Sequence, residues 1–139
     1  MKKFFSLILV VLIAVTFLSG CSGKPAEDVI KIGINYELTG NVASYGQSSV
    51  EGIELAIEEI NKAGGINGKK IQAVKYDNKS DPAEATSLAT KLITQDKVIA
   101  ILGPATTGAF KATIPVATQH KVPVASGSTT GDDVTVDSK

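Results

Sequence analysis

The sequence predicts an α/β fold: an open parallel sheet with helices on both of its faces. Three observations lead to this prediction. Short β-branched or apolar segments alternate along the chain with longer segments of helical periodicity. The run Val98–Leu102 is apolar at every position, which is typical of a strand buried on both faces of a parallel sheet. Loops rich in threonine, serine and glycine follow the strands, and the carboxyl ends of parallel strands share one edge.

The first half of the chain supplies two strands and one helix. Val29–Ile34 alternates and is rich in β-branched residues, so we predict a strand there. Apolar residues then recur on one helical face from about Gln47 to Ala63, at Val50, Ile53, Ile57 and Ile60. Gly64-Gly65 ends this helix, because glycine tolerates the left-handed conformation. Asn67-Gly68 predicts a turn into a second strand, Ile71–Tyr76.

The second half continues the alternation. Asp81 followed by Pro82 has the form of a helix start, with an acidic N-cap and proline at the first helical position. The buried strand described above comes after this helix. Gly108–His120 is expected to be helical, with a kink or break at Pro115. Val122–Ala125 completes the order β-α-β-α-β-α-β, which favours right-handed crossovers.

Three polar loops are expected to meet at the carboxyl edge of the sheet: residues 35–46, 103–108 and 126–131. Hydroxyls and free backbone N–H groups at such an edge suit a small ligand with an anionic group. The chain contains no arginine, so an anion here would be held by hydroxyls, backbone N–H groups and a helix amino end. Thr106 and Thr107 could instead only cap a helix. Likewise, Ser126–Thr130 could be a solvated loop, and Tyr45 could serve ordinary packing.

The amino-terminal segment predicts a signal peptide. Lys2 and Lys3 precede the apolar run Phe4–Leu18, which is too short to indicate a membrane span clearly. The small residues Ser19-Gly20 before Cys21, the only cysteine, resemble a bacterial lipobox. The lipobox implies cleavage before Cys21 and attachment of lipid to it, and a stray or buried thiol is the alternative.

We therefore expect a lipoprotein signal peptide at residues 1–20, a tether at 21–28 and a folded domain at 29–139. The predicted location is extracytoplasmic, with the lipid anchor as the only contact with the membrane. Two of the 14 lysines lie in the signal segment, which leaves a net charge near −2 and argues against nucleic acid as a partner. No pattern in the sequence calls for a cofactor or a metal ion.

An enzyme is a weaker interpretation of this sequence. The chain has no Gly-x-Ser-x-Gly motif, and its single histidine, His120, lies away from the polar loops. Asp132 and Asp133 near Ser128 are the only candidates for acid or base chemistry. A secreted lipoprotein hydrolase remains the alternative to a binding protein.

Four segments together resemble the branched-chain amino-acid binding proteins of ABC importers: Leu38–Gly46, Glu51–Ala56, Ile60–Gly68 and Gly103–Gly108. The resemblance implies a type I periplasmic-binding-protein fold, in which two lobes close on one amino acid. It also implies delivery of Leu, Ile or Val to an importer permease. Members of this family are more than twice as long, so we expect an incomplete amino-terminal lobe. A sensory receptor domain of the same fold is a further alternative.

The resemblance also implies site residues. Tyr45 matches the aromatic residue beside the ligand, and Thr107, with Thr106 as the alternative, matches the hydroxyl that follows the Gly-Pro turn. Ser128 and Thr130 match the two contact positions in the loop after the fourth strand. The first lobe of the family holds the α-carboxylate and α-ammonium of the ligand.

The loop after the fourth strand departs from the pattern of the family. Gly127 stands where the family often has proline, and Gly131-Asp132 replaces a common Asn-Pro. The shape of this loop, and with it the role of Ser128, is therefore the least constrained part of the expected site.

Overall fold

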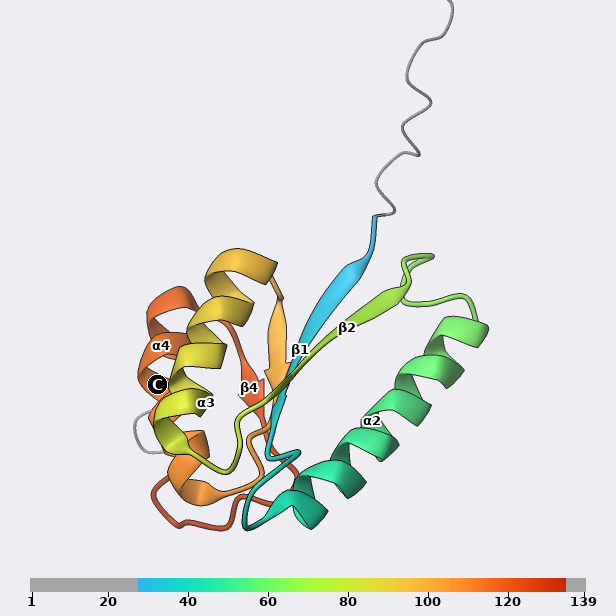
Figure 1. The fold of residues 1–139 in the computed structure, drawn as a ribbon. Helices are drawn as coiled ribbons and strands as arrows, with labels where there is room; N and C mark the ends of the chain where they lie inside the picture. Colours follow the sequence, from blue (N-terminus) through green and yellow to red (C-terminus); the bar gives the residue numbers. More distant parts are fainter. Residues whose placement is uncertain (1–27, 135–139) are drawn as a thin grey trace, which may run out of the picture.

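A computed structural model of the chain describes residues 28–134. Within that range a single four-stranded parallel sheet has the order β2-β1-β3-β4 (Figure 1). The strands are β1 (Ile30–Tyr36), β2 (Ile71–Asp77), β3 (Ala100–Leu102) and β4 (Val124–Ala125). β1 is central and pairs with β2 over its whole length, with Ile30 opposite Ile71 and Tyr36 opposite Asp77. The predicted α/β class with a parallel sheet is confirmed.

Three helices flank the sheet. They are α2 (Ala43–Lys62), α3 (Pro82–Lys91), which continues into the π-helical turn η1 (Leu92–Asp96), and α4 (Thr107–His120). Figure 1 shows α2 on one face of the sheet and α3 and α4 together on the other. Asp81 caps α3 as predicted, since its carboxylate accepts a hydrogen bond of 2.8 Å from the backbone N–H of Glu84. No helix within residues 28–134 is both long and apolar enough to cross a membrane.

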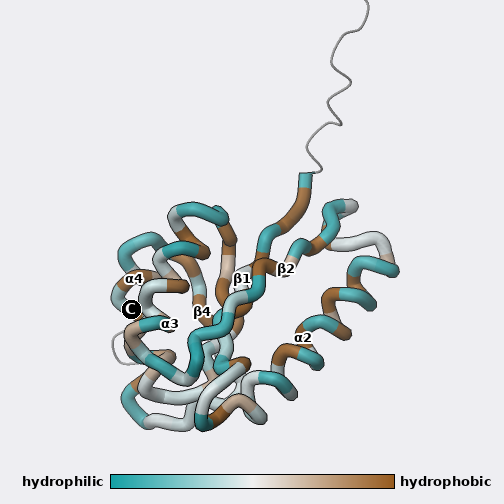
Figure 2. The backbone as a smooth tube through the Cα atoms, viewed as in Figure 1, coloured by the Kyte–Doolittle hydropathy of each residue, from teal (hydrophilic) through white to brown (hydrophobic). Residues whose placement is uncertain are grey.

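Each face of the sheet has its own hydrophobic cluster. On the α3 and α4 face the buried members are Ala89, Leu92, Ile93, Val98 and Ile101. On the α2 face they are Ile34, Tyr36, Val50 and Ala105. Hydrophobic residues recur along α2 among hydrophilic ones, as expected for a helix with one face toward a sheet (Figure 2). The second cluster lies next to the carboxyl edge and so supports the loops there.

The first loop is shorter than predicted at both ends. β1 extends through Asn35 and Tyr36 because a buried polar network satisfies Asn35. The Asn35 amide donates to the carbonyl of Ala85 at 2.8 Å and accepts from the amide of Asn78 at 3.3 Å. The helix begins at Ala43 instead of Gln47, so the loop covers only residues 37–42.

Two further boundaries were wrong, and the helix does not break at Pro115. β3 begins at Ala100, and Ile99 is 60% exposed, because Lys97 adopts a left-handed conformation after η1 and turns the chain just before the strand. β4 is reduced to two residues. α4 runs without a break through Pro115, whose side chain is exposed, so the ring projects into solvent.

Gly46 lets the first turn of α2 lie directly on the end of β1. A Cβ atom at this position would come within 2.0 Å of the carbonyl oxygen of Glu37 and 2.6 Å of its carbonyl carbon. Gly52, six residues along the same helix, would meet nothing within 4 Å. Substitutions at these two positions can therefore distinguish the effect of close packing from the effect of glycine's low helix propensity.

We expect Gly46→Ala to lower the free energy of unfolding by about 1–3 kcal/mol, because backbone must move to admit the methyl group. Gly52→Ala should raise it by about 0.5–1 kcal/mol through the gain in helix propensity. Urea denaturation followed by circular dichroism measures both. Equal effects of the two substitutions would contradict the close packing of α2 on Glu37.

Candidate functional site

The carboxyl ends of the four strands and the amino ends of α2 and α4 lie at one edge of the domain (Figure 1). Three loops meet there: residues 37–42 after β1, 103–106 after β3 and 126–131 after β4. We call this set of loops the carboxyl-edge site. It is the edge at which open α/β sheets bind ligands.

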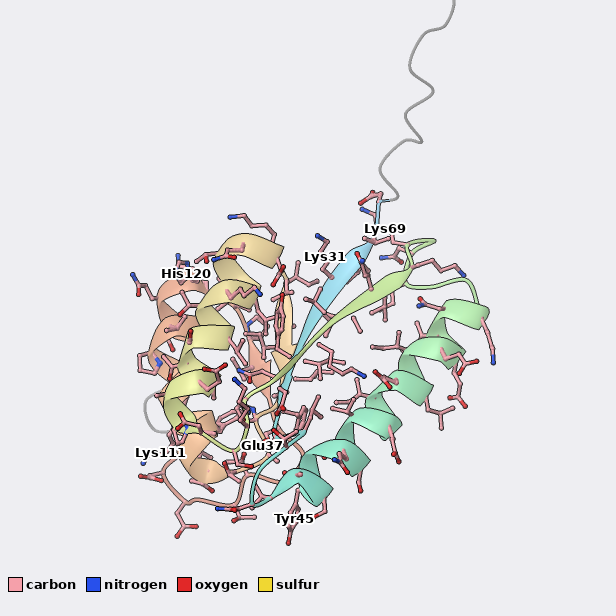
Figure 3. The ribbon with its side chains drawn as sticks, viewed as in Figure 1. Lys31, Glu37, Tyr45, Lys69, Lys111 and His120 are labelled. Carbon is pink, nitrogen blue, oxygen red and sulfur yellow. The ribbon has the colours of Figure 1, made fainter. Side chains whose placement is uncertain are left out.

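Glu37 joins the first two loops of the carboxyl-edge site. Its side chain is fully buried, and its carboxylate accepts hydrogen bonds from the backbone N–H groups of Ala105 at 2.9 Å and Thr106 at 3.1 Å. The hydroxyl of Thr106 donates to the same carboxylate at 2.9 Å. Figure 3 labels Glu37 at this edge, between the starts of α2 and α4. Sequence analysis missed this residue, although a lone acid between Tyr36 and Leu38, directly after a strand, was a signal.

The contacts of Glu37 distinguish the two neighbouring threonines. Thr106 is the N-cap of α4 by position, yet its side chain makes no capping hydrogen bond, because the hydroxyl donates to Glu37. Thr107 is the first residue of α4 and is partly exposed. Of the pair, Thr107 is therefore the residue whose hydroxyl is free of Glu37 and available at the surface of the edge.

The loop after β4 packs onto the loop after β3. The Ser128 hydroxyl donates to the carbonyl of Ala105 at 2.9 Å, and the hydroxyl of Thr129 donates to that of Ser126 at 2.8 Å. A Cβ atom on Gly131 would come within 2.6 Å of the Thr107 methyl group, so the loop after β4 also lies against the first residue of α4. Thr130, between these contacts, is exposed. The structure thus brings together Thr106, Thr107, Ser128 and the neighbourhood of Thr130.

Tyr45 comes from a different element than these hydroxyls. It belongs to the first turn of α2, not to a loop as predicted, and its side chain is 64% exposed. In Figure 3 it projects from the carboxyl edge at the start of α2. Its assigned role beside a ligand stays a prediction, as do the roles of the four hydroxyl residues.

Asp77 ties the loop after β1 to the loop after β2. Its carboxylate accepts from the backbone N–H groups of Leu38 at 2.9 Å, Thr39 at 3.1 Å and Lys79 at 2.8 Å, and from the Thr39 hydroxyl at 2.6 Å. Burial acts to raise the pKa of Asp77, but these hydrogen bonds together outweigh it, so that the pKa lies below its ordinary value.

A cavity of about 530 Å³ lies beside the carboxyl-edge site, between α2 and the ends of β1, β3 and β4. Tyr36, Ser49, Leu102 and Ser126 are among its lining residues, and none of the five predicted ligand-binding residues is. Burial raises the pKa of the Tyr36 phenol, although hydrogen bonds with Ser49 and the Gly127 backbone act in the opposite direction. The phenol therefore stays neutral at physiological pH.

The geometry offers little for catalysis. His120 is at the carboxyl end of α4, on the side of the domain opposite the carboxyl-edge site (Figure 3). Ser128 uses its hydroxyl proton in a bond to a backbone carbonyl, and Asp133 pairs with Lys111. Residues 28–134 contain no group of three or more His, Cys, Asp or Glu side chains that could hold a metal ion. The arrangement of hydroxyls and helix amino ends instead suits reversible binding of a small polar ligand.

Comparison with known proteins also points to a binding protein. Residues 29–138 match the family described as periplasmic binding protein. An amino acid binding protein of Pseudomonas aeruginosa is 43% identical over 91 residues, which cover 66% of this chain and 24% of that protein. A leucine-, isoleucine-, valine-, threonine- and alanine-binding protein of the same species is 46% identical over 68 residues, covering 49% of this chain and 18% of that protein.

A solved structure extends the comparison to three dimensions. The branched-chain amino acid transporter substrate binding protein LivJ from Streptococcus pneumoniae, in complex with isoleucine, is 51% identical with a TM-score of 0.77. The match covers 78% of this chain and 31% of the solved one.

The chain is thus an α/β domain with the fold of periplasmic binding proteins. It belongs to the periplasmic binding protein family, and the resemblance to the branched-chain amino-acid binding proteins of ABC transporters is confirmed. The chain spans about a fifth to a quarter of the length of the two curated relatives described above.

Asp77 gives a prediction about pH. A carboxyl group whose pKa is lowered by folding stabilises the protein above its unfolded pKa, near 3.8, and loses that contribution as pH falls through the lower folded value. Asp77→Asn should therefore lower the free energy of unfolding by about 1–2 kcal/mol at pH 7. The difference in the free energy of unfolding between the variant and the wild type should become smaller below about pH 4. Urea denaturation at pH 7, 4 and 3 tests this, and a gap that does not change with pH would contradict it.

Proposed function

We propose that the protein of which this chain is part binds a branched-chain amino acid and delivers it to an ABC importer. The observation that carries this proposal is that Ser128 and Gly131, which flank Thr130 in the loop after β4, lie against Ala105 and Thr107 at the amino end of α4. The likeness to LivJ, which was solved with isoleucine, supports the choice of ligand. Leucine, isoleucine and valine are the candidates.

The α-carboxylate of the ligand has no arginine to pair with in this chain. We infer that it accepts hydrogen bonds from the hydroxyls of Thr107 and Thr130 and from backbone N–H groups in the first turn of α4. The positive end of the α4 dipole favours a negative charge at this place. Ser128, whose proton is engaged with Ala105, keeps oxygen lone pairs that suit the α-ammonium group.

The geometry gives the alternative of a hydrolase no support, because the Ser128 hydroxyl donates to a backbone carbonyl and Asp133 pairs with Lys111. A solute binding protein from Rhodopseudomonas palustris, solved with 3,4-dihydroxybenzoic acid, is 36% identical with a TM-score of 0.73. It supports an aromatic acid as a second candidate ligand, which the binding experiment below includes.

In the full-length product of this gene, Thr130→Ala should weaken binding of leucine, isoleucine and valine by about ten- to a hundred-fold. The basis is that a hydrogen bond to a charged group contributes roughly 1.5–3 kcal/mol. Isothermal titration calorimetry with the three amino acids and 3,4-dihydroxybenzoate measures the change.

Asp81→Ala is the control for this experiment. It removes the cap of α3, which costs about 1 kcal/mol of stability, and it should leave affinity nearly unchanged. If Thr130→Ala binds like the wild type while Asp81→Ala loses affinity, the ligand does not bind at the amino end of α4. Tight binding of the aromatic acid alone would favour the second candidate.

We also propose that the protein is lipid-anchored outside the cytoplasm through Cys21, which lies outside the described residues. The lipobox-like Ser19-Gly20-Cys21 after an apolar run supports this. Domain boundaries of 1–20 for the signal peptide, 21–28 for the tether and 29–139 for the folded lobe go with the proposal. The importer permease is the proposed partner.

Radiolabelled palmitate should enter the wild-type protein in a bacterial host and be absent from Cys21→Ala, because the thiol is the proposed attachment point. Equal labelling of the two proteins would refute the anchor. A Cys21→Ala protein that still binds amino acid would show that anchor and binding are independent.

A further inference from the structure

Glu37 is a buried acid that the proposed binding function does not use directly. Its side chain has no exposed surface, and its backbone carbonyl lies under Gly46 in the first turn of α2. Its carboxylate lies across the sheet edge at the start of α4, where it meets Ala105 and Thr106. One residue therefore connects the end of β1, the start of α2 and the start of α4.

The energetics of burial make this connection rigid. A buried carboxylate is costly unless its oxygens are paired, and here three donors satisfy them. Hydrogen bonds to an ionised acceptor are shorter and stronger than neutral ones. Moving the loop 103–106 away from Glu37 would leave the acid unpaired, so the loop is held where the carboxylate requires it.

The same contacts decide which groups can face a ligand. The N–H groups of Ala105 and Thr106, together with the Thr106 hydroxyl, are engaged by Glu37. The next two residues, Thr107 and Gly108, stand in the first turn of α4, where N–H groups have no helical acceptor, and both are accessible. Glu37 thus engages the N–H groups just before α4 and leaves those of Thr107 and Gly108 open.

We propose that Glu37 is the positioning residue of the site: it acts through the loop 103–106 to present Thr107 and Gly108 to the ligand's carboxylate. This rests on the proposed function, since it concerns the same site. It also excludes the ligand from the N–H groups of Ala105 and Thr106. A purely structural acid would change stability and leave affinity alone, so affinity is the deciding measurement.

The experiment uses the full-length product and isoleucine as the probe. Glu37→Gln keeps the size of the side chain but sets an amide NH₂ against donors. Glu37→Asp keeps the acid but shortens its reach by one methylene, and it serves if the glutamine variant fails to fold. Both should weaken isoleucine binding at least ten-fold by calorimetry, because both release the loop.

Asn61→Ala is the matched control. Asn61 also holds two backbone groups, the N–H of Ile71 at 2.7 Å and its carbonyl at 2.8 Å, but at the opposite edge of the sheet. It should lower the melting temperature and keep the affinity for isoleucine within two-fold of wild type. Binding by both Glu37 variants within two-fold of wild type would overturn the proposal.

A second measurement needs no ligand. In ¹H–¹⁵N spectra, Glu37→Gln should shift the amide resonances of Thr107 and Gly108 as well as those of Ala105 and Thr106, whereas Asn61→Ala should leave all four in place. Unshifted Thr107 and Gly108 resonances would overturn the positioning role. Failure of the wild type to bind any of the three amino acids would refute the proposed function instead, and the spectra would still decide the role of Glu37.

Discussion

The interaction on which the site depends is the burial of the Glu37 carboxylate against the start of α4. It fixes the loop after β3 relative to the end of β1, and Gly46 allows α2 to close over the same residue. The loop after β4 is then positioned in turn, because Ser128 bonds to the carbonyl of Ala105 in the held loop. A buried acid with three donors constrains geometry more tightly than surface contacts of the same number would.

This arrangement would give the proposed site a way to hold an anionic group without arginine. The amino end of α4 supplies a positive dipole and a limited set of N–H groups, and Glu37 accepts from the N–H of the N-cap Thr106 and from that of Ala105 before it. The remaining donors are the N–H groups of Thr107 and Gly108. The loop after β4, which contains Ser128, lies against Thr107 at the same edge of the sheet. Asp77 gives the loop after β1 a comparable support from the side of β2, through three hydrogen bonds.

The sequence predicted the class of fold and the meeting of three polar loops at one edge of the sheet, because both follow from periodicity and from parallel topology. It predicted the cap at Asp81, which depends only on local chemistry. It missed the extension of β1 through Asn35 and the role of Glu37, since both depend on partners about 50 to 70 residues away in the chain. It overestimated β3 because an apolar run does not show where the preceding turn places Ile99. Polar contacts between residues far apart in the chain leave no local pattern in the sequence. The contacts of Asn35 and Glu37 could therefore be found only in the three-dimensional structure.

The measurement that tests this account most directly is a crystal structure of the full-length product with isoleucine bound. We predict that the α-carboxylate lies within hydrogen-bond distance of Thr107 and Thr130, with Glu37 still bonded to the N–H groups of Ala105 and Thr106. An isoleucine seated in the cavity beside Tyr36, or a ligand carboxylate that replaces Glu37 on those two N–H groups, would contradict it.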